Sequence, residues 1–307
     1  MMWTRRRFVR ASAATVVAPH IFMQAPPPTL LFIDAHVHVW KHDPAFPFAP
    51  GAHPPAEDAS AEMLLALMRA NAVARTVLIQ VIHYRWDNSY LAGVLKRYPR
   101  EFHGVCRINP EDPAAPDQLS RLTQDQGFSG VRLSPAAGPE GDWIRGALMP
   151  PLWRRCAQLK VPMTLLIPVT RLPDVHPLIE ANPDLQVVID HMADSPLEQA
   201  AQPAQPEKLD LLLALERYPK VFVKISHMWS LSKQAFPYPD AAVQVKRLYD
   251  TFGAKRLMAG TDWPISLKQL SYAQAVDLFR NHLGFIPPED HAQILYKTVQ
   301  QVWPFHL

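Results

Sequence analysis

His36 and His38, two histidines separated by a single residue, are the side chains whose type and spacing most directly suit metal binding or catalysis. They follow the apolar residues 30–33, so this stretch is typical of a short strand buried on both faces, as in a parallel sheet. Side chains alternate across a strand, so both imidazoles should point the same way at its C-terminal end. There they could share a metal ion or hold a polar substrate group. The alternative is that they only cap backbone groups.

Strand-like and helix-like runs alternate along the rest of the chain. Strands are expected over residues 31–37, 76–81, 102–108, 128–133, 163–167, 186–189, 221–225 and 256–259. Helices are expected over residues 62–71, 89–98, 117–126, 149–159, 175–181, 208–218, 241–252 and 270–283. This alternation predicts an α/β fold with a parallel sheet, and eight units in this length favour a single-domain (β/α)8 TIM barrel. A doubly wound nucleotide-binding sheet would need a Gly-x-Gly-x-x-Gly turn after its first strand, which the sequence lacks.

Polar side chains gather at the C-terminal ends of these runs, which is where (β/α)8 barrels place their chemistry. After the two histidines come Gln80, His83, Tyr84 and Asn88; Arg107 and Asn109; Arg132 and Ser134; Asp190 and His191; Lys224, Ser226 and His227; and Thr261, Asp262 and Trp263. The fifth run differs, because it ends at Ile167 and Pro168 without an acid or an imidazole. The sequence therefore predicts a polar site at one end of the barrel.

Five short motifs at these strand ends form an ordered set. They are Ile33-Asp34-Ala35-His36-Val37-His38, Gly130-Val131-Arg132-Leu133, Val188-Ile189-Asp190-His191, Val223-Lys224-Ile225-Ser226 and Gly260-Thr261-Asp262-Trp263-Pro264. Together they resemble the amidohydrolase superfamily, specifically its amidohydrolase-related branch. Within that branch the chain looks like the lactonase-type hydrolases, which open sugar lactones or carboxylated lactones and pyrones. The resemblance implies a (β/α)8 fold and a site of His36, His38, His191 and Asp262.

The resemblance also bears on metal content. Many metal-dependent members of the superfamily carry a lysine or histidine at the end of the fourth or fifth strand, where this chain has Arg132-Leu133-Ser134 and Ile167-Pro168. We therefore expect at most one divalent ion, Zn or Mn, and no organic cofactor. Its ligands would come from His36, His38, His191 and Asp262. Lactonases of this type are known with and without a metal, so the alternative is that the histidines polarise the substrate carbonyl directly.

Opening a lactone requires an activated water, a group that polarises the carbonyl and a proton for the leaving alkoxide. Asp262 suits the base that takes the proton of the water, and the alternative is a helix cap. His191 is the second catalytic candidate, with a buried histidine bonded to a backbone carbonyl as its alternative. Arg132 could grip a substrate carboxylate or serve as a structural ion-pair partner. Further substrate contacts are expected from Gln80, His83, Tyr84, Asn88, His227 and Trp263.

These residues predict an enzyme whose partner is a small-molecule substrate. The leading hypothesis is a hydrolase that opens a small polar or carboxylated lactone with base-activated water at the C-terminal mouth of the barrel. The alternatives are a zinc-dependent decarboxylase of the same superfamily and a catalytically inactive periplasmic binding protein, against which the intact set of histidines and aspartate argues. The formal net charge of +3 gives no indication of nucleic-acid binding. Nothing in the sequence indicates an oligomeric state.

The N-terminal residues have the pattern of an export signal. Residues 4–10, Thr-Arg-Arg-Arg-Phe-Val-Arg, resemble the bacterial twin-arginine signal, and a weakly apolar run follows over residues 11–18. We therefore expect residues 1–28 to be a twin-arginine-type signal and residues 29–307 to form the barrel domain. This assignment predicts a periplasmic or secreted protein that uses the twin-arginine export machinery and has no membrane segment in its mature chain. The alternative is a disordered basic tail.

Replacing Arg5 and Arg6 by lysine tests the export assignment. The double variant should stay in the cytoplasm, because the resemblance to the export signal depends on this arginine pair. Immunoblots of cell fractions measure the distribution. Arg10→Lys, which keeps the pair, is the matched control and should be exported like the parent chain. Undiminished periplasmic recovery of the double variant would contradict the assignment.

Overall fold

The computed structural model describes residues 30–134, 143–194 and 206–307, so the predicted signal over residues 1–28 lies outside the described chain. The strands within it are β1 Phe32–Val37, β2 Val73–Ile79, β3 Phe102–Cys106, β4 Gly130–Leu133, β5 Met163–Leu165, β6 Val187–Ile189, β7 Val221–Lys224 and β8 Leu257–Met258. They form one parallel sheet in chain order, β1 to β8. The predicted single-domain (β/α)8 barrel is therefore confirmed.

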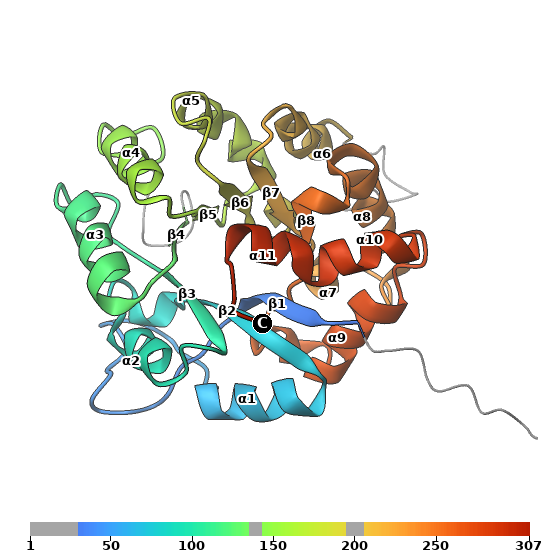
Figure 1. The fold of residues 1–307 in the computed structure, drawn as a ribbon, viewed down its shortest axis with the longest axis horizontal. Coiled ribbons are helices and arrows are strands. Elements are labelled where there is room, and N and C mark those ends of the chain that lie inside the picture. Colours follow the sequence, from blue (N-terminus) through green and yellow to red (C-terminus); the bar gives the residue numbers. More distant parts are fainter. Residues whose placement is uncertain (1–29, 135–142, 195–205) are drawn as a thin grey trace, which may run out of the picture.

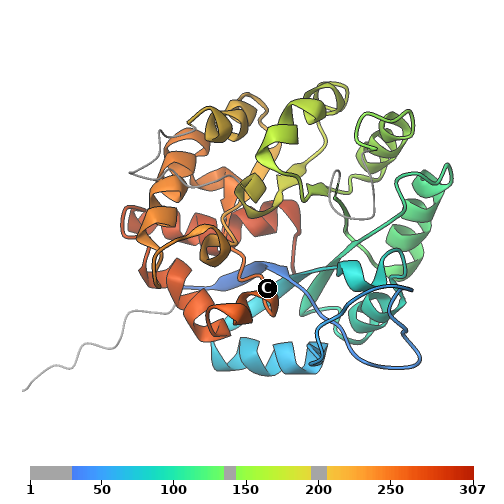
Figure 2. The same ribbon diagram turned by 180° about the vertical axis from the view of Figure 1, so that it is seen from behind.

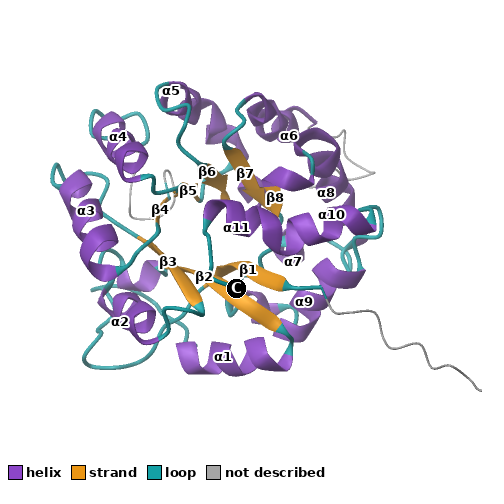
Figure 3. Cartoon of the chain, in the orientation of Figure 1, coloured by secondary structure: helices purple, strands orange, loops and turns teal. Residues whose placement is uncertain are grey.

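Helices surround the strands on the outside of the barrel (Figures 1 and 3). They are α1 Ala61–Ala70, α2 Ser89–Arg97, α3 Ala115–Gln126, α4 Met149–Leu159, α5 His176–Glu180, α6 Pro206–Leu213, α7 Met228–Leu231, α8 Pro239–Phe252, α9 Tyr272–Asn281, α10 Pro288–Ala292 and α11 Thr298–Val302. The helix predicted over residues 208–218 is α6 followed by the 3-10 turn Ala214–Arg217. The short helices α7, α10 and α11 are additions that the sequence patterns did not predict.

Hydrogen bonds between β1 and the segment after β8 close the barrel. The backbone N–H of Asp262 donates to the carbonyl of His36 (2.9 Å), and the N–H of His38 donates to the carbonyl of Trp263 (2.8 Å). Gly260 permits this close approach, because a Cβ atom at this position would lie only 2.8 Å from Cβ of His36. The closure therefore sets the carboxylate of Asp262, in the segment after β8, beside the two histidines at the end of β1.

The C-terminal segment covers the opposite end of the barrel. Trp303 belongs to the apolar cluster inside the barrel, together with Ile33, Val105 and Phe222. Its indole N–H donates to the carbonyl of Ser129, just before β4 begins (3.1 Å). In Figure 1 the helix α11 lies across this end, and Figure 2 shows the molecule from the other end. With the N-terminal ends of the strands covered, the C-terminal ends are left to form a site.

β1 changes which of its side chains point inward. Ala35 lies in the apolar cluster inside the barrel, whereas Val37, which strict alternation would also place there, packs in the outer cluster. The register of β1 against β2 shifts between Asp34 and Val37. Such an irregularity re-aims the side chains that follow it. Ala35 points into the barrel, and strict alternation would turn His36 and His38 away from it. The shift reverses this, so both histidines also point into the barrel.

The carboxylate of Asp34 ties β1 to the loop after β8. It is fully buried and accepts hydrogen bonds from the Thr261 N–H (2.9 Å), the Thr261 hydroxyl (2.6 Å), the His36 N–H (3.2 Å) and the Tyr272 hydroxyl (3.3 Å). Burial raises the pKa of Asp34 to about 6, while the donated hydrogen bonds oppose this rise. The contacts make Asp34 a structural residue of the barrel closure.

Replacing Asp34 by alanine should lower the free energy of unfolding by about 3 kcal/mol or more, because several buried donors lose their acceptor. Urea-induced unfolding monitored by circular dichroism measures the change. The control is Asp210→Ala, which removes an exposed carboxylate that is 3.1 Å from the guanidinium of Arg247. That change should cost less than about 1 kcal/mol. Equal, small effects of the two substitutions would show that Asp34 does not hold the closure.

Candidate active site

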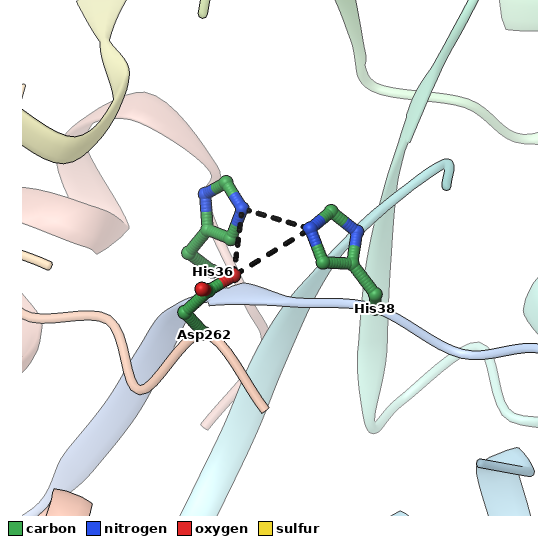
Figure 4. A group of neighbouring side chains, drawn as sticks. All are labelled: His36, His38 and Asp262. Carbon is green, nitrogen blue, oxygen red and sulfur yellow. Dashed lines mark hydrogen bonds and ion pairs between the residues drawn. The ribbon is translucent and has the colours of Figure 1, made fainter. Parts of the chain in front are cut away.

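His36, His38 and Asp262 meet at the C-terminal end of β1. Nε2 of His36 lies 3.2 Å from Nε2 of His38, and each lies 3.6 Å from Oδ1 of Asp262. Figure 4 shows this oxygen pointing at both imidazoles. All three side chains are nearly inaccessible to solvent. The pair of histidines predicted from the sequence and the aspartate expected from the barrel closure are therefore in contact.

The donor atoms of this group fit a single divalent ion. The Nδ1–H of His38 donates to the carbonyl of Ile79 (2.8 Å), which leaves the lone pair of Nε2 facing the group. Two ligands of a tetrahedral ion with bonds of about 2.0 Å are about 3.3 Å apart, close to the 3.2 Å that separates the two Nε2 atoms. Burial lowers the pKa of His36 and of His38 to about 3 each, so both are neutral, as ligation requires.

A buried cluster of charges lies behind His36. Asp190, the first residue after β6, is 2.9 Å from Nε of Arg132 through Oδ2 and 3.0 Å from Nζ of Lys224 through Oδ1. The same Oδ1 is 3.3 Å from Nδ1 of His36. Burial alone would raise the pKa of Asp190, but the charges of Lys224 and Arg132, together with the hydrogen bond to His36, outweigh it and hold the pKa well below 3.8. Arg132 therefore makes a structural ion pair, one of the two roles expected for it.

His191 follows Asp190 and faces the site. Its Nδ1 is 2.8 Å from the hydroxyl of Ser226, and its ring centroid is 4.5 Å from that of His36. Burial, reinforced by the charge of His227, holds the pKa of His191 well below 6.5. His191 can join either of two ligand groups, one with His36 and Asp190 and one with His227 and Asp262. The imidazole is thus neutral and within reach of the same small volume.

His227, after β7, connects two carboxylates. Its Nε2 is 3.1 Å from Oδ2 of Asp262, and its Nδ1 is 3.3 Å from Oδ1 of Asp194. Its ring stacks on that of His191, with centroids 4.1 Å apart. Burial alone would lower the pKa of His227, but the hydrogen bonds and charges of Asp194 and Asp262 outweigh it and raise the pKa to about 9.

The backbone of the site is left-handed at several non-glycine residues. His191, Met192, Ala193 and Asp194 have φ values of 52°, 54°, 55° and 45°, which form a left-handed turn directly after β6. His227 and Asp262 have φ values of 67° and 58°. This conformation costs about 1–2 kcal/mol for an ordinary L-residue and collects at functional sites.

The polar residues after β2 serve the local loop. The Asn88 side-chain amide donates to the carbonyls of Trp86 (2.9 Å) and Arg107 (2.8 Å) and accepts from the Arg107 N–H (3.0 Å). The Gln80 amide donates to the carbonyl of Asp87. Substrate contacts through Gln80 and Asn88 therefore stay predictions, and they would require these amides to exchange partners.

Two of the aromatic candidates, Tyr84 and His83, contact the long connection between β1 and α1. The Tyr84 hydroxyl donates to the carbonyl of Lys41 (3.0 Å), and the Tyr84 ring stacks on Phe48 with centroids 4.8 Å apart. His83 is half-buried with its ring edge-on to Trp40. Trp263 is 2% exposed and packs edge-on against Tyr272. Substrate contacts through Tyr84, His83 and Trp263 stay predictions as well.

The comparison with known proteins agrees with this geometry. The sequence model of the amidohydrolase family matches residues 33–305. This chain belongs to the amidohydrolase family. An L-fucono-1,5-lactonase of Burkholderia ambifaria is 28% identical to this amidohydrolase over 243 residues, which cover 76% of the chain and 80% of the relative. A 2-pyrone-4,6-dicarboxylate hydrolase of Comamonas testosteroni is 27% identical over 241 residues, with 76% of each chain covered.

The fold is also that of solved structures. A Pseudomonas putida protein proposed to be a 2-pyrone-4,6-dicarboxylic acid hydrolase superposes on this amidohydrolase with a TM-score of 0.75 at 27% identity. The match covers 91% of this chain and 99% of that one. The resemblance inferred from the strand-end motifs is thus confirmed for the family and for the barrel. Among the described residues no helix has the length and apolar character needed to cross a bilayer.

The sequence analysis left one role of Asp262 open and missed one residue of this amidohydrolase site. The turn after Asp262 has Pro264 at its N-cap and receives no side-chain cap, so the carboxylate of Asp262 does not serve as a helix cap there. Asp194 was not predicted, because it lies five residues beyond the end of its strand-like run. Only the left-handed turn brings it to His227, and no pattern of apolar residues signals such a turn.

Proposed function

We propose that this amidohydrolase opens a small lactone that carries polar or carboxylate groups. The observation that carries the proposal is the contact of Oδ1 of Asp262 with Nε2 of both His36 and His38 at the C-terminal mouth of the barrel. The names of the relatives support the substrate class, because they act on a sugar lactone and on a pyrone dicarboxylate.

Asp262 is the general base in this proposal. Its position is fixed by its backbone N–H, which donates to the His36 carbonyl, and its Oδ1 faces the space that the two imidazoles also face. A carboxylate there accepts a proton from a water molecule as the water attacks the lactone carbonyl. The ring C–O bond to the acyl carbon then breaks, and the proton held by Asp262 passes to the leaving alkoxide. Lactone and water thus give the ring-opened hydroxy acid, whose carboxyl group ionises and releases a proton to solvent, so no further reactant is needed.

One divalent ion, Zn or Mn, would be held by His36, His38 and Asp262, with His191 as the remaining candidate ligand. When bound, such an ion supplies Lewis acidity toward the carbonyl oxygen of the substrate. The neutral imidazole of His191 lies on the same side of the site, where it can donate to or accept from the substrate. Arg132 and Lys224 add positive charge at the base of the site, which favours an anionic substrate.

A panel of lactones tests the proposal. Purified protein, alone and with Zn²⁺ or Mn²⁺, should release protons from aldonolactones or carboxylated lactones in a pH-stat. A catalysed opening should produce the hydroxy acid without carbon dioxide. Carbon dioxide release from acyl carboxylates, with no proton release from any lactone, would instead support the decarboxylase hypothesis.

Asp262→Asn should lower kcat by roughly 10²-fold or more, because the amide keeps the shape of the carboxylate but cannot accept the proton of the water. Initial rates on the best lactone of the panel measure the loss. Circular dichroism and the melting temperature should be nearly unchanged, since the backbone bonds of Asp262 do not involve its side chain. A folded variant with near-normal turnover would move the base to another residue, with His191 the first to be examined.

A further inference from the structure

Among the described residues, His227 forms the ion pair with Oδ2 of Asp262, the oxygen that faces away from the two histidines of β1. The other nitrogen of the same ring faces the carboxylate of Asp194 at 3.3 Å. One face of the imidazole stacks on His191, and the ring also meets Trp229 edge-on with centroids 4.8 Å apart. The ring is therefore held in one orientation by four neighbours.

The backbone at His227 argues that this side chain is required. Its φ of 67° lies in the left-handed region, where glycine is unstrained and a histidine is not. Asp194 has the same kind of backbone, with a φ of 45°, at the end of the left-handed turn after β6. Two strained residues from separate loops thus meet through their side chains, and such strain persists where the surrounding structure or the function requires it.

We propose that His227 and Asp194 are positioning residues that orient the carboxylate of Asp262. His227 holds Oδ2 at 3.1 Å, and this directs Oδ1 toward Nε2 of His36 and Nε2 of His38. Asp194 acts one step further away, because it holds the ring of His227 through Nδ1. The inference rests on the proposed function only for its activity readout, since the orientation of Asp262 can be measured without any substrate.

The physical reason is the rotational freedom of a carboxylate. The backbone of Asp262 is fixed by its bond to His36, but that bond leaves the side-chain torsions free. Without a partner for Oδ2, the two oxygens could exchange or swing away from the imidazoles of β1. A partner that binds one oxygen holds the other in place, as outer partners do for the ligands of metal sites.

The test compares His227→Gly with the parent chain. Glycine suits the left-handed backbone, so the substitution removes the imidazole and should leave the melting temperature little changed. Crystal structures should show Oδ1 of Asp262 turned away from His36 and His38. The affinity for Zn²⁺, measured by competition with a chromophoric chelator, should fall about 10–100-fold. On a lactone substrate, kcat should fall by a similar factor while KM changes little.

Two more variants complete the design. Asp194→Asn keeps the shape of that side chain but weakens its hold on the ring, and should shift the Zn²⁺ affinity and kcat in the same direction by a smaller factor. It also keeps the test valid if His227→Gly does not fold. Lys160→Gly is the matched control, because Lys160 is exposed with a φ of 55° at the end of α4, far from these residues in the fold. It should change neither quantity.

An unchanged Asp262 orientation with parent-like Zn²⁺ affinity in His227→Gly would overturn the inference. A rise in KM with kcat intact would overturn it too, since it would make His227 a substrate contact. If the parent chain binds Zn²⁺ too weakly to measure, the crystallographic comparison decides alone. If the parent chain opens no lactone, the proposed function fails, and the orientation of Asp262 in the variants still decides this inference.

Discussion

The hydrogen bonds that join β1 to the loop after β8 are the constraint on which the site depends. Asp34, two residues before His36, accepts from the N–H and the hydroxyl of Thr261, the residue before Asp262, across 227 positions of sequence. β8 itself is only two residues long, so its ladder contributes little to closure. The buried side-chain bonds of Asp34 take over that task. They set the spacing between the histidines of the first strand and the carboxylate of the last, and a small error there would separate the donor atoms.

Burial and the neighbouring charges keep the imidazoles of His36 and His191 neutral. Taking Asp190, Arg132 and Lys224 out of water costs several kcal/mol for each ion, and only their mutual contacts offset this cost. The cluster is therefore weak evidence for stability. Its more direct effect is on the protonation of the neighbouring histidines. Burial is the main cause that lowers the pKa of His36 and of His191; the charge of Lys224 adds to it at His36 and that of Arg132 at His191, while the ionised Asp190, which lies against Nδ1 of His36, opposes it. Neutral rings with lone pairs directed into the site are the result.

The sequence predicted the barrel well, because apolar strand runs and helical periodicity are local signals that repeat along the chain. It also placed His36, His38, His191 and Asp262 at strand ends. The closure of the barrel then brings these strand ends together. It could not predict the register shift in β1, since alternation from Ala35 would turn the histidines outward. The left-handed turn after β6 could not be predicted from the sequence either. A residue takes that conformation because of tertiary contacts, and no local propensity favours it.

The strained backbone and the proposed site lie in the same part of the molecule for a structural reason. Left-handed residues follow β6, β7 and β8, at the C-terminal ends where the strands release the chain. A regular continuation would carry these side chains along the strand direction and away from the barrel axis. Turning the backbone the other way brings His191, His227 and Asp262 back over the axis, at an energetic cost that the covered N-terminal end and the buried closure can offset. The packed N-terminal half of the barrel therefore stabilises a strained C-terminal half, and the residues of the proposed site lie in the strained half.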